Sequence, residues 1–484
     1  MNFEPQCVKT MSNTTDISIT GPPFELDLSP VDQIYGRVYS RRILAFECAE
    51  YGIDTITSIL RSALQATVNQ IPYLAGSIKG ALFTGRADGK AFVEKGAAHL
   101  IVKDVRHEFN FAELKARGFP ASDLPHESLV PVPFIARLTE PRDVCRIQCN
   151  FIKGGLLLVV SCFHAVFDGV AITAVINLFS HHCAAYQKDR GYNRDIVLAQ
   201  LSPPLDFNRS AIIQCGDTKI DQVLQHYGVT DGSPPVMPGG KIPGSVTVTK
   251  DFHLTSAAIA RLKTTASSGG HSQWISSSDA VNALIWRCQV RARLGDKLVE
   301  ANDTVTYKFL VDFRRLLPKP LSAGWLGNAI MLVNANTITV SDLLAPAGLS
   351  SAAQAIRGAI RELDAEFMSS FVGFLNKHNP MHVTYFLSDL ETTTLETTSH
   401  RGFDHSSMNW GEAFGTYHGV YVPDSPIMLS GFTIIKPPSP RGDGWDVSVS
   451  LKDSSMALLE TDEEWSAYTK EIDEPLVNGN GSHE

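Results

Sequence analysis

The sequence predicts an α/β protein of two domains, each a β-sheet flanked by helices, with a cleft between them. Apolar stretches of strand length alternate with stretches of helical period in both halves of the chain. The 484 residues, 44% of them hydrophobic, suffice for two cores. A polar, proline-bearing passage without a sustained period separates the halves. We therefore predict an N-terminal domain over residues 1–205, a crossover linker over 206–244 and a C-terminal domain over 245–484.

The clearest strand–helix pair of the sequence surrounds His164. Residues 156–160 read Leu-Leu-Leu-Val-Val, which predicts a strand buried on both faces. Residues 170–179 repeat apolar side chains at helical spacing, which predicts a helix. His164 therefore falls at a strand-to-helix junction, where a reactive side chain can face the cleft.

Two of the helices predicted in the second half rest on specific patterns. Ser276, with Asp279 three residues later, is typical of a capping box in front of a helix over Ala280 to Arg293. A single further helix is predicted by an apolar stripe that we expect in the core, formed by Ile356, Ile360, Leu363, Phe367 and Phe371.

Charge and cysteine usage exclude several classes of partner. A net charge of −9 argues against nucleic acid. Apolar runs are far shorter than the ~20 residues that span a bilayer, and residues 1–19 lack the apolar segment of a secretory signal, so we expect no membrane partner. The eight cysteines show no Cys-x-x-Cys spacing and are expected as buried thiols. The sequence therefore predicts a cytoplasmic protein.

The junction carries His164, Asp168 and Gly169 in the pattern His-x-x-x-Asp-Gly. A neutral imidazole, with an ordinary pKa of about 6.5, can take a proton from a hydroxyl and return it to a leaving group. Asp168, one helical turn on, is better suited to hold the junction by pairing with a cation. Two other interpretations stay open: a core histidine with Asp168 as a helix N-cap, and a shared metal ion, although no second ligand pair has convincing spacing.

At this motif the chain resembles the BAHD acyltransferases, whose signature is His-x-x-x-Asp-Gly. Further blocks similar to that family occur in its order along the chain, at residues 21–33, 203–209, 276–288, 311–316 and 325–329. Residues 409–415 are closer to the Asp-Trp-Gly form of fungal relatives such as trichothecene acetyltransferases, but Asn409 stands where the aspartate is expected.

The resemblance implies a two-domain fold related to chloramphenicol acetyltransferase, with mixed sheets flanked by helices and an active-site channel between the domains. It further implies transfer of an acyl group, expected to be acetyl, from acyl-CoA to a hydroxyl of a fungal secondary metabolite, with His164 as general base. Acyl-CoA would be a co-substrate, with no tightly bound cofactor and no metal. We expect a monomer whose partners are the acyl-CoA donor and a small alcohol acceptor.

The resemblance also implies roles for single residues. Arg314 is expected to pair with Asp168 across the domain interface, and Gly169, Asn409 and Gly411 to support the structure. Three residues are candidates for substrate binding: Ser399 for the donor's pantetheine, Trp410 with Ser399 as oxyanion donors, and His405 in a glycine-rich loop near the cleft.

Two alternatives of other classes stay open. The first is a related enzyme that uses the same cleft for a reaction without free coenzyme A, such as cyclisation, proton transfer or carrier-protein-dependent condensation. The second is a non-catalytic binding protein, which the intact His164, Asp168 and Gly169 disfavour.

Overall fold

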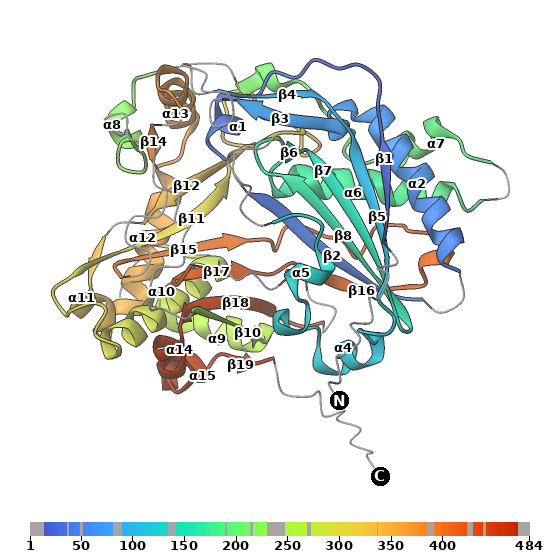
Figure 1. The fold of residues 1–484 in the computed structure, drawn as a ribbon. Helices are drawn as coiled ribbons and strands as arrows, with labels where there is room; N and C mark the ends of the chain where they lie inside the picture. The colour runs from blue at the N-terminus through green and yellow to red at the C-terminus, as the bar shows by residue number, and fades with distance from the viewer. Residues whose placement is uncertain are drawn as a thin grey trace, which may run out of the picture.

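The chain forms two large β-sheets, each with its own hydrophobic core. The computed structural model describes residues 14–35, 38–48, 52–80, 90–133, 142–188, 191–212, 216–229, 247–268, 273–335, 337–380, 382–384, 392–423, 429–438 and 442–472. Figure 1 shows the first sheet on the right beside helices α2 and α6, and the second at the lower left among helices α9, α10 and α14. Both sheets contain parallel and antiparallel pairs, so the predicted α/β class with mixed sheets is confirmed.

The first sheet has six strands in the order β1-β5-β7-β8-β2-β16. Their bounds are β1 Thr14–Ile19, β2 Tyr39–Glu47, β5 Ala98–Asp104, β7 Cys145–Ile152, β8 Gly155–Phe163 and β16 Thr416–Tyr421. Every residue of β8 is buried, as its unbroken apolar run predicts. Helix α2 (Ile53–Gln70) packs on helix α6 (Gly169–Ala185), which is the helix predicted after His164.

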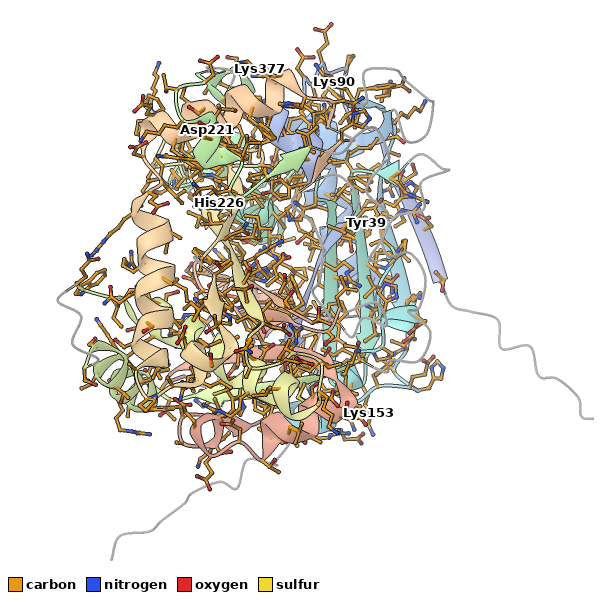
Figure 2. All side chains as sticks on the ribbon, turned by 90° about the vertical axis from the view of Figure 1, so that its left-hand side faces the viewer. Tyr39, Lys90, Lys153, Asp221, His226 and Lys377 are labelled. Carbon is orange, nitrogen blue, oxygen red and sulfur yellow. The ribbon has the colours of Figure 1, made fainter. Side chains whose placement is uncertain are left out.

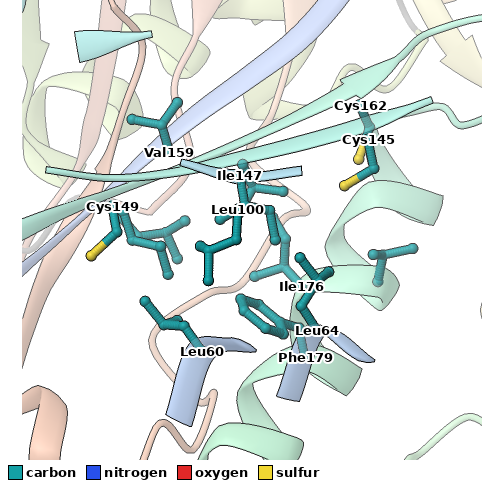
Figure 3. Close-up of a cluster of buried hydrophobic side chains, with 14 of the residues drawn as sticks. Leu60, Leu64, Leu100, Cys145, Ile147, Cys149, Val159, Cys162, Ile176 and Phe179 are labelled. Atoms are coloured by element: carbon teal, nitrogen blue, oxygen red, sulfur yellow. The ribbon is translucent and has the colours of Figure 1, made fainter. Parts of the chain in front are cut away.

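The core of this half lies between the first sheet and its two long helices. Figure 3 shows Leu60 and Leu64 from α2 and Ile176 and Phe179 from α6 beneath strand residues such as Ile147. Cys145 and Cys162 lie opposite each other on β7 and β8 in the same core. Within the described ranges the cysteines are free, and all but Cys48 are buried.

The second sheet runs in the order β12-β11-β15-β17-β18-β10-β19, with β13 paired to β11. Its strands are β10 Thr247–Leu254, β11 Thr304–Asp312, β12 Ile330–Asn334, β13 Ile338–Thr339, β15 Thr394–Ser399, β17 Phe432–Ile435, β18 Trp445–Lys452 and β19 Lys470–Glu471. Its helices are α9 Ser256–Ser267, α10 Ser277–Gly295, α11 Val340–Leu344, α12 Gly348–Arg361, α13 Ala365–Lys377, α14 Asp453–Glu460 and α15 Glu463–Ser466.

The two helix predictions that rest on specific patterns have different outcomes. The capping box before α10 is present: Ser276 accepts the N–H of Asp279, and Asp279 accepts the N–H of Ser276. The single helix expected from Ile356 to Phe371 is wrong, because the chain forms α12 and α13 instead. Asp364 lies between them as the N-cap of α13, accepting the N–H of Phe367 at 2.8 Å.

The remaining elements are short. They are α1 Pro30–Ile34, β3 Gly76–Gly80, β4 Ala91–Lys95, α4 Phe111–Arg117, α5 His126–Leu129, β6 Arg142–Asp143, α7 Arg194–Ala199, α8 Ile220–Val223, β9 Gly228–Val229 and β14 Val383–Thr384, with 3-10 turns η1 Pro72–Ala75, η2 Ala121–Asp123, η3 Arg209–Ile212 and η4 Glu412–Phe414. Strands β3, β4 and β6 form a small sheet, and β9 pairs with β14.

The two halves exchange segments across the predicted linker. Val31 and Ile34 of α1 belong to the second core, whereas β16 is an edge strand of the first sheet and Phe414 belongs to the first core. Each half therefore contributes to the packing of the other. The division at residues 206–244 stays a prediction, and the end of that linker from residue 230 lies outside the described residues.

The described part of the linker is tied to the second half. His226 accepts a hydrogen bond at Nδ1 from the N–H of Asn334, at 3.0 Å, and its ring packs against Phe367. His226 is buried, and Figure 2 shows it apart from Tyr39 of the first sheet. None of the helices in the described ranges is long and apolar enough to cross a membrane.

Candidate active site

His164 lies at the junction that the sequence predicts, directly after β8 and before α6. Its backbone N–H donates to the carbonyl oxygen of Val38 at 2.9 Å, which ties the turn to the start of β2. The ring of Tyr35 lies with its centroid 6.0 Å from that of the imidazole. The His164 residue is partly buried.

The second half of the chain reaches His164 through Asn328. The Nδ1 atom of His164 lies 3.2 Å from Oδ1 of Asn328, and Nδ2 of Asn328 donates to the backbone oxygen of His164 at 2.8 Å. Asn328 stands shortly before β12, so the imidazole is held from both halves at once.

Asp168 is a buried connector between the halves. As N-cap of α6, it accepts the N–H of Ala171 at 2.9 Å, and it also accepts the N–H of Ala329 at 2.9 Å. Arg314 donates to both of its carboxylate oxygens, at 2.8 and 2.9 Å. Asp168 is 0% exposed and Arg314 3% exposed, so this bidentate pair is removed from water. Asp168 is therefore both the N-cap of α6 and the partner of a cation, the two interpretations that the sequence left open.

The local environment sets the charges of these groups. Burial lowers the pKa of His164 below its ordinary value, although the Asp168 carboxylate and the hydrogen bond to Asn328 partly oppose this. Burial alone would raise the pKa of Asp168, but Arg314 and the N–H groups of Ala171 and Ala329 outweigh it and lower the pKa. At neutral pH the imidazole is therefore neutral, and Asp168 is a carboxylate.

Sequence reasoning missed the residues that hold Asn328. Asp32 accepts both the backbone N–H and the Nδ2–H of Asn328 at Oδ1, at 2.9 and 2.8 Å. Arg209 forms an ion pair with the other carboxylate oxygen of Asp32 and donates to the backbone oxygen of Val166 at 2.7 Å. The available signal was the similarity of residues 21–33, 203–209 and 325–329 to segments of the family, but this similarity predicted no role for Asp32, Arg209 or Asn328.

Gly169 allows two segments to approach closely. A Cβ on Gly169 would lie 2.3 Å from Cζ of Phe403 and 3.3 Å from Nη2 of Arg42. The guanidinium of Arg42 stacks on the Phe403 ring, 4.6 Å from its centroid, and donates to the backbone oxygen of Gly169 at 3.1 Å. The motif glycine therefore makes room for an aromatic ring from the second half.

We expect Gly169→Ala to lower the free energy of unfolding by about 1–3 kcal/mol, the usual cost of forcing an extra methyl into a packed site. In a Phe403→Ala background the same change is expected to cost nothing, because the obstructing ring is gone and alanine favours a helix. Denaturant unfolding of the two single variants and the double variant measures this. Equal losses in both backgrounds would contradict the role given to Phe403.

His405 is placed differently from the expectation that it contacts substrate. It is buried, its Nε2 accepts from Arg42 at 3.1 Å, and its Nδ1–H donates to the backbone oxygen of Phe403 at 2.9 Å. Burial and the nearby Arg42 lower its pKa to about 3, so the ring is neutral. Both ring nitrogens are used within the protein, and we correct its role to that of a partner for Arg42.

Trp410 is likewise not at the site. It is buried in the first core against Phe46, Phe179 and Phe414, so it cannot serve as an oxyanion donor beside His164. The prediction that Trp410 donates to the oxyanion is wrong because the loop directs its side chain into the first core.

Gln187 at the end of α6 holds the loop around Trp410. Its Nε2 donates to the backbone oxygen of Trp410, and its Oε1 accepts the N–H of Ala413. Gly411 has a φ of +78° and lies against Gln187, where a Cβ would come within 2.4 Å of Nε2. The exposed Asn409 accepts the N–H of Gly411 at 3.1 Å, a local turn contact that needs only an oxygen acceptor.

Ser399 and His400 lie at the end of β15. Ser399 is exposed and remains a candidate for donor binding. His400 donates its backbone N–H to Ile435 at 2.8 Å, and its ring centroid lies 5.1 Å from that of Phe403. Burial, with Arg42, His405 and His164 nearby, lowers its pKa to about 3. The end of β15 thus reaches the surroundings of His164.

These contacts hold a neutral imidazole, on a residue that is only partly buried, in a fixed position. Such a group can accept a proton from a bound molecule and return it, and Asp168 and Arg314 are left to hold the support. In the ranges that the structure describes, His, Cys, Asp and Glu side chains nowhere gather in threes that could hold a metal ion.

A comparison with known protein families identifies the family of this chain. A family model described as "Transferase family" matches residues 18–466. The chain belongs to the Transferase family.

Two of the relatives that this chain resembles are fungal proteins. One is "Enoyl-CoA isomerase/hydratase claC" of Penicillium crustosum, 30% identical over 93% of this chain; the chain spans only about half, 52%, of that relative. Another is "Trichothecene 3-O-acetyltransferase TRI101" of Fusarium sporotrichioides, 24% identical over 96% of this chain and 100% of the relative. The solved structure of that enzyme with coenzyme A and T-2 superimposes with a TM-score of 0.78 at 21% identity, covering 93% of this chain and 100% of that one.

These matches confirm the predicted family and its two-sheet fold.

Proposed function

We propose that the protein is an acyl-CoA-dependent O-acyltransferase that acetylates a hydroxyl of a fungal secondary metabolite. The observation that carries this proposal is the neutral imidazole of His164, a partly buried residue that Asn328 fixes between the two halves. The names of several relatives support the acetyl group and the acceptor class, among them a trichothecene 3-O-acetyltransferase and an eremophilane O-acetyltransferase.

In the proposed reaction His164 acts as general base and then as general acid. It removes the proton of the acceptor hydroxyl as that oxygen attacks the thioester carbonyl, which gives a tetrahedral oxyanion. When the carbon–sulfur bond breaks, the imidazolium returns the proton to the leaving thiolate. The products are an ester and free coenzyme A, and His164 is neutral again.

Incubation with acetyl-CoA and a panel of fungal sesquiterpene and polyketide alcohols tests the proposal. We expect free thiol to form together with an acceptor whose mass has increased by one acetyl group. Deoxynivalenol and T-2 toxin belong in the panel because solved relatives were crystallised with them. A parent enzyme that neither binds acetyl-CoA nor releases thiol with any alcohol would contradict acyl transfer.

Proton transfer on a CoA thioester is a second candidate, favoured by the name of the Penicillium relative. This chain spans about half of that protein, and the same imidazole could move a proton without breaking the thioester. Incubation of an enoyl-CoA in heavy water distinguishes the two reactions. Incorporation of deuterium without thiol release would favour proton transfer.

The lowered pKa of His164 predicts how the reaction depends on pH. Only the neutral ring can accept a proton, so kcat/KM should be level around neutral pH and fall as the pH decreases through the pKa of His164. Because that pKa lies below its ordinary value of about 6.5, we expect the inflection below pH ~6.5. Initial rates of thiol release at fixed ionic strength measure it, and an inflection above neutrality would contradict a base with this environment.

We also infer that the protein acts as a cytoplasmic monomer. The free cysteines of the described residues support a reducing compartment. Both proposed substrates, an alcohol and acyl-CoA, are small molecules that require no macromolecular partner.

A further inference from the structure

Glu396 is a buried acidic residue of the second sheet that the proposed reaction does not use. It lies on β15, is 3% exposed, and its Oε2 atom has no hydrogen-bond partner among the residues that the structure describes. Burial raises the pKa of its carboxyl to about 7, although Lys308, opposite it on β11, partly opposes this. A buried carboxyl without a partner costs free energy, because its lost hydration is not replaced. A bound molecule that supplies the missing partner would explain such a group.

The two faces of β15 have different surroundings. Leu395 belongs to the second core. The Thr397 hydroxyl lies 2.5 Å from that of Tyr307, whose ring stacks on Trp286 of α10. These two side chains of β15 therefore face the helices. Because side chains alternate along a strand, Glu396 points to the opposite face of the sheet.

The surroundings of Glu396 on that face are largely apolar. Phe432 lies opposite Glu396 on β17, and Ile434 lies opposite Thr398 in the same register. Phe432 and Ile434 belong to neither of the two hydrophobic cores that the described residues form, although Ile434 is only 6% exposed. We refer to these four residues as the inner face of the second sheet. Apolar side chains with a few polar groups among them are the usual lining of a small-molecule site.

The inner face leads towards His164. His400 follows the end of β15, and His164 lies near enough to it to contribute to its lowered pKa. Four residues of strand separate Glu396 from His400, a distance of about 13 Å. An acceptor must therefore extend well beyond its reacting hydroxyl to contact both His164 and Glu396.

We propose that Glu396 is a specificity-determining residue that binds a second hydroxyl of the acceptor, remote from the one that is acetylated. The inference rests on the proposed function and deepens it, because it selects diols and polyols among the alcohols. A hydroxyl suits this site better than an amine, since Lys308 already brings positive charge to the carboxyl. A hydroxyl can donate to the carboxylate or accept from the protonated carboxyl, and either bond gives Glu396 the partner it lacks.

Acceptors that differ at one hydroxyl test the specificity. They are a polyol of the panel that the parent acetylates, and its derivatives in which each of the other hydroxyls is methylated in turn. We expect one methylation to lower kcat/KM of the parent, and Glu396→Leu to reduce this preference about 10–100-fold, as for the loss of a hydrogen bond to an ionisable group. The KM for acyl-CoA should not change.

Two further variants make the comparison specific. Glu396→Gln should restore most of the preference, because an amide also binds a hydroxyl. Glu362→Leu, at an exposed position after α12, is the matched control and should keep the preference of the parent. An equal preference in the parent and in Glu396→Leu would overturn the proposal.

Denaturant unfolding separates recognition from a structural role. Above the pKa of the carboxyl, we expect Glu396→Leu and Glu396→Gln to unfold at the same denaturant concentration as the parent or a higher one, because a buried carboxylate without a partner is removed. A leucine variant that unfolds at a clearly lower concentration would show that the carboxyl stabilises the fold, against the proposal.

Labelling with dicyclohexylcarbodiimide tests the site without any acyl transfer. The O–H of a protonated carboxyl adds across a C=N bond of this apolar reagent, and the acyl group then moves to nitrogen, so the whole reagent stays attached. At mildly acidic pH we expect mass spectrometry to find the label on Glu396 in the folded parent, and the polyol acceptor to slow its attachment. Protein unfolded in urea is the positive control. A folded protein without label on Glu396 would overturn the proposal, because no ligand could reach the carboxyl.

The proposal and the proposed function can fail separately. Labelling of Glu396 that a panel alcohol slows, without thiol release from acyl-CoA, would contradict acyl transfer and support a ligand site at Glu396. Thiol release with the same acceptor preference in the parent and in Glu396→Leu would support acyl transfer and overturn the role of Glu396.

Discussion

Replacing His164 by alanine is expected to lower kcat/KM for acyl transfer by about 10²–10⁴-fold, the usual contribution of a positioned general base. The reason is that the variant has no neutral imidazole to take the proton of the acceptor while Asp168, Arg314 and the surrounding support remain. Initial rates of thiol release at saturating acyl-CoA measure the effect.

The control for this variant is His107→Ala, because the His107 side chain is 70% exposed and lies in the turn between β5 and α4. We expect it to retain the parent rate. A His164→Ala protein that unfolds like the parent and keeps its rate within a few-fold would remove His164 as the base. The reaction would then need another proton acceptor.

The predictable part of the fold is the part that local patterns specify. The unbroken apolar run of β8 has one physical solution, a strand covered on both faces, and the helix after Asp168 follows from its period. The capping box of Ser276 and Asp279 is equally local. The apolar stripe beyond Ile356 led to the wrong prediction of one helix because its helical period continues across Asp364. In the structure Asp364 is the N-cap of a second helix, so the chain forms two helices there.

The part of the site that the sequence did not reveal depends on contacts between distant segments. Asn328 and Asp32 are 296 positions apart, and no local pattern indicates that one orients the other. The loop residues Trp410 and His405 show the converse. A family block suggested a substrate contact for Trp410 and a glycine-rich loop suggested one for His405, but both side chains are buried. Tertiary packing decides which face of a loop is buried. The identity of a single residue in the sequence does not indicate which face that will be.

Asp168→Ala should have the largest effect on stability, lowering the free energy of unfolding by about 3–5 kcal/mol. The buried guanidinium of Arg314 would lose both carboxylate hydrogen bonds and remain as an uncompensated charge, and α6 would lose its N-cap. Denaturant unfolding measures this. Asp312→Ala is a matched control, because Asp312 also contacts Arg314, at 3.2 Å, but its side chain is 42% exposed; we expect a loss of at most about 1 kcal/mol.

A double variant separates charge from position. In Asp168→Ala combined with Arg314→Met, no buried charge is left unpaired, so we expect stability to recover well beyond that of Asp168→Ala alone. If Asp168→Ala instead unfolded at the same denaturant concentration as the parent and yet released no thiol, the main role of Asp168 would not be its ion pair with Arg314. Its carboxylate would then act on His164 directly, through the same charge that opposes the lowering of the imidazole pKa.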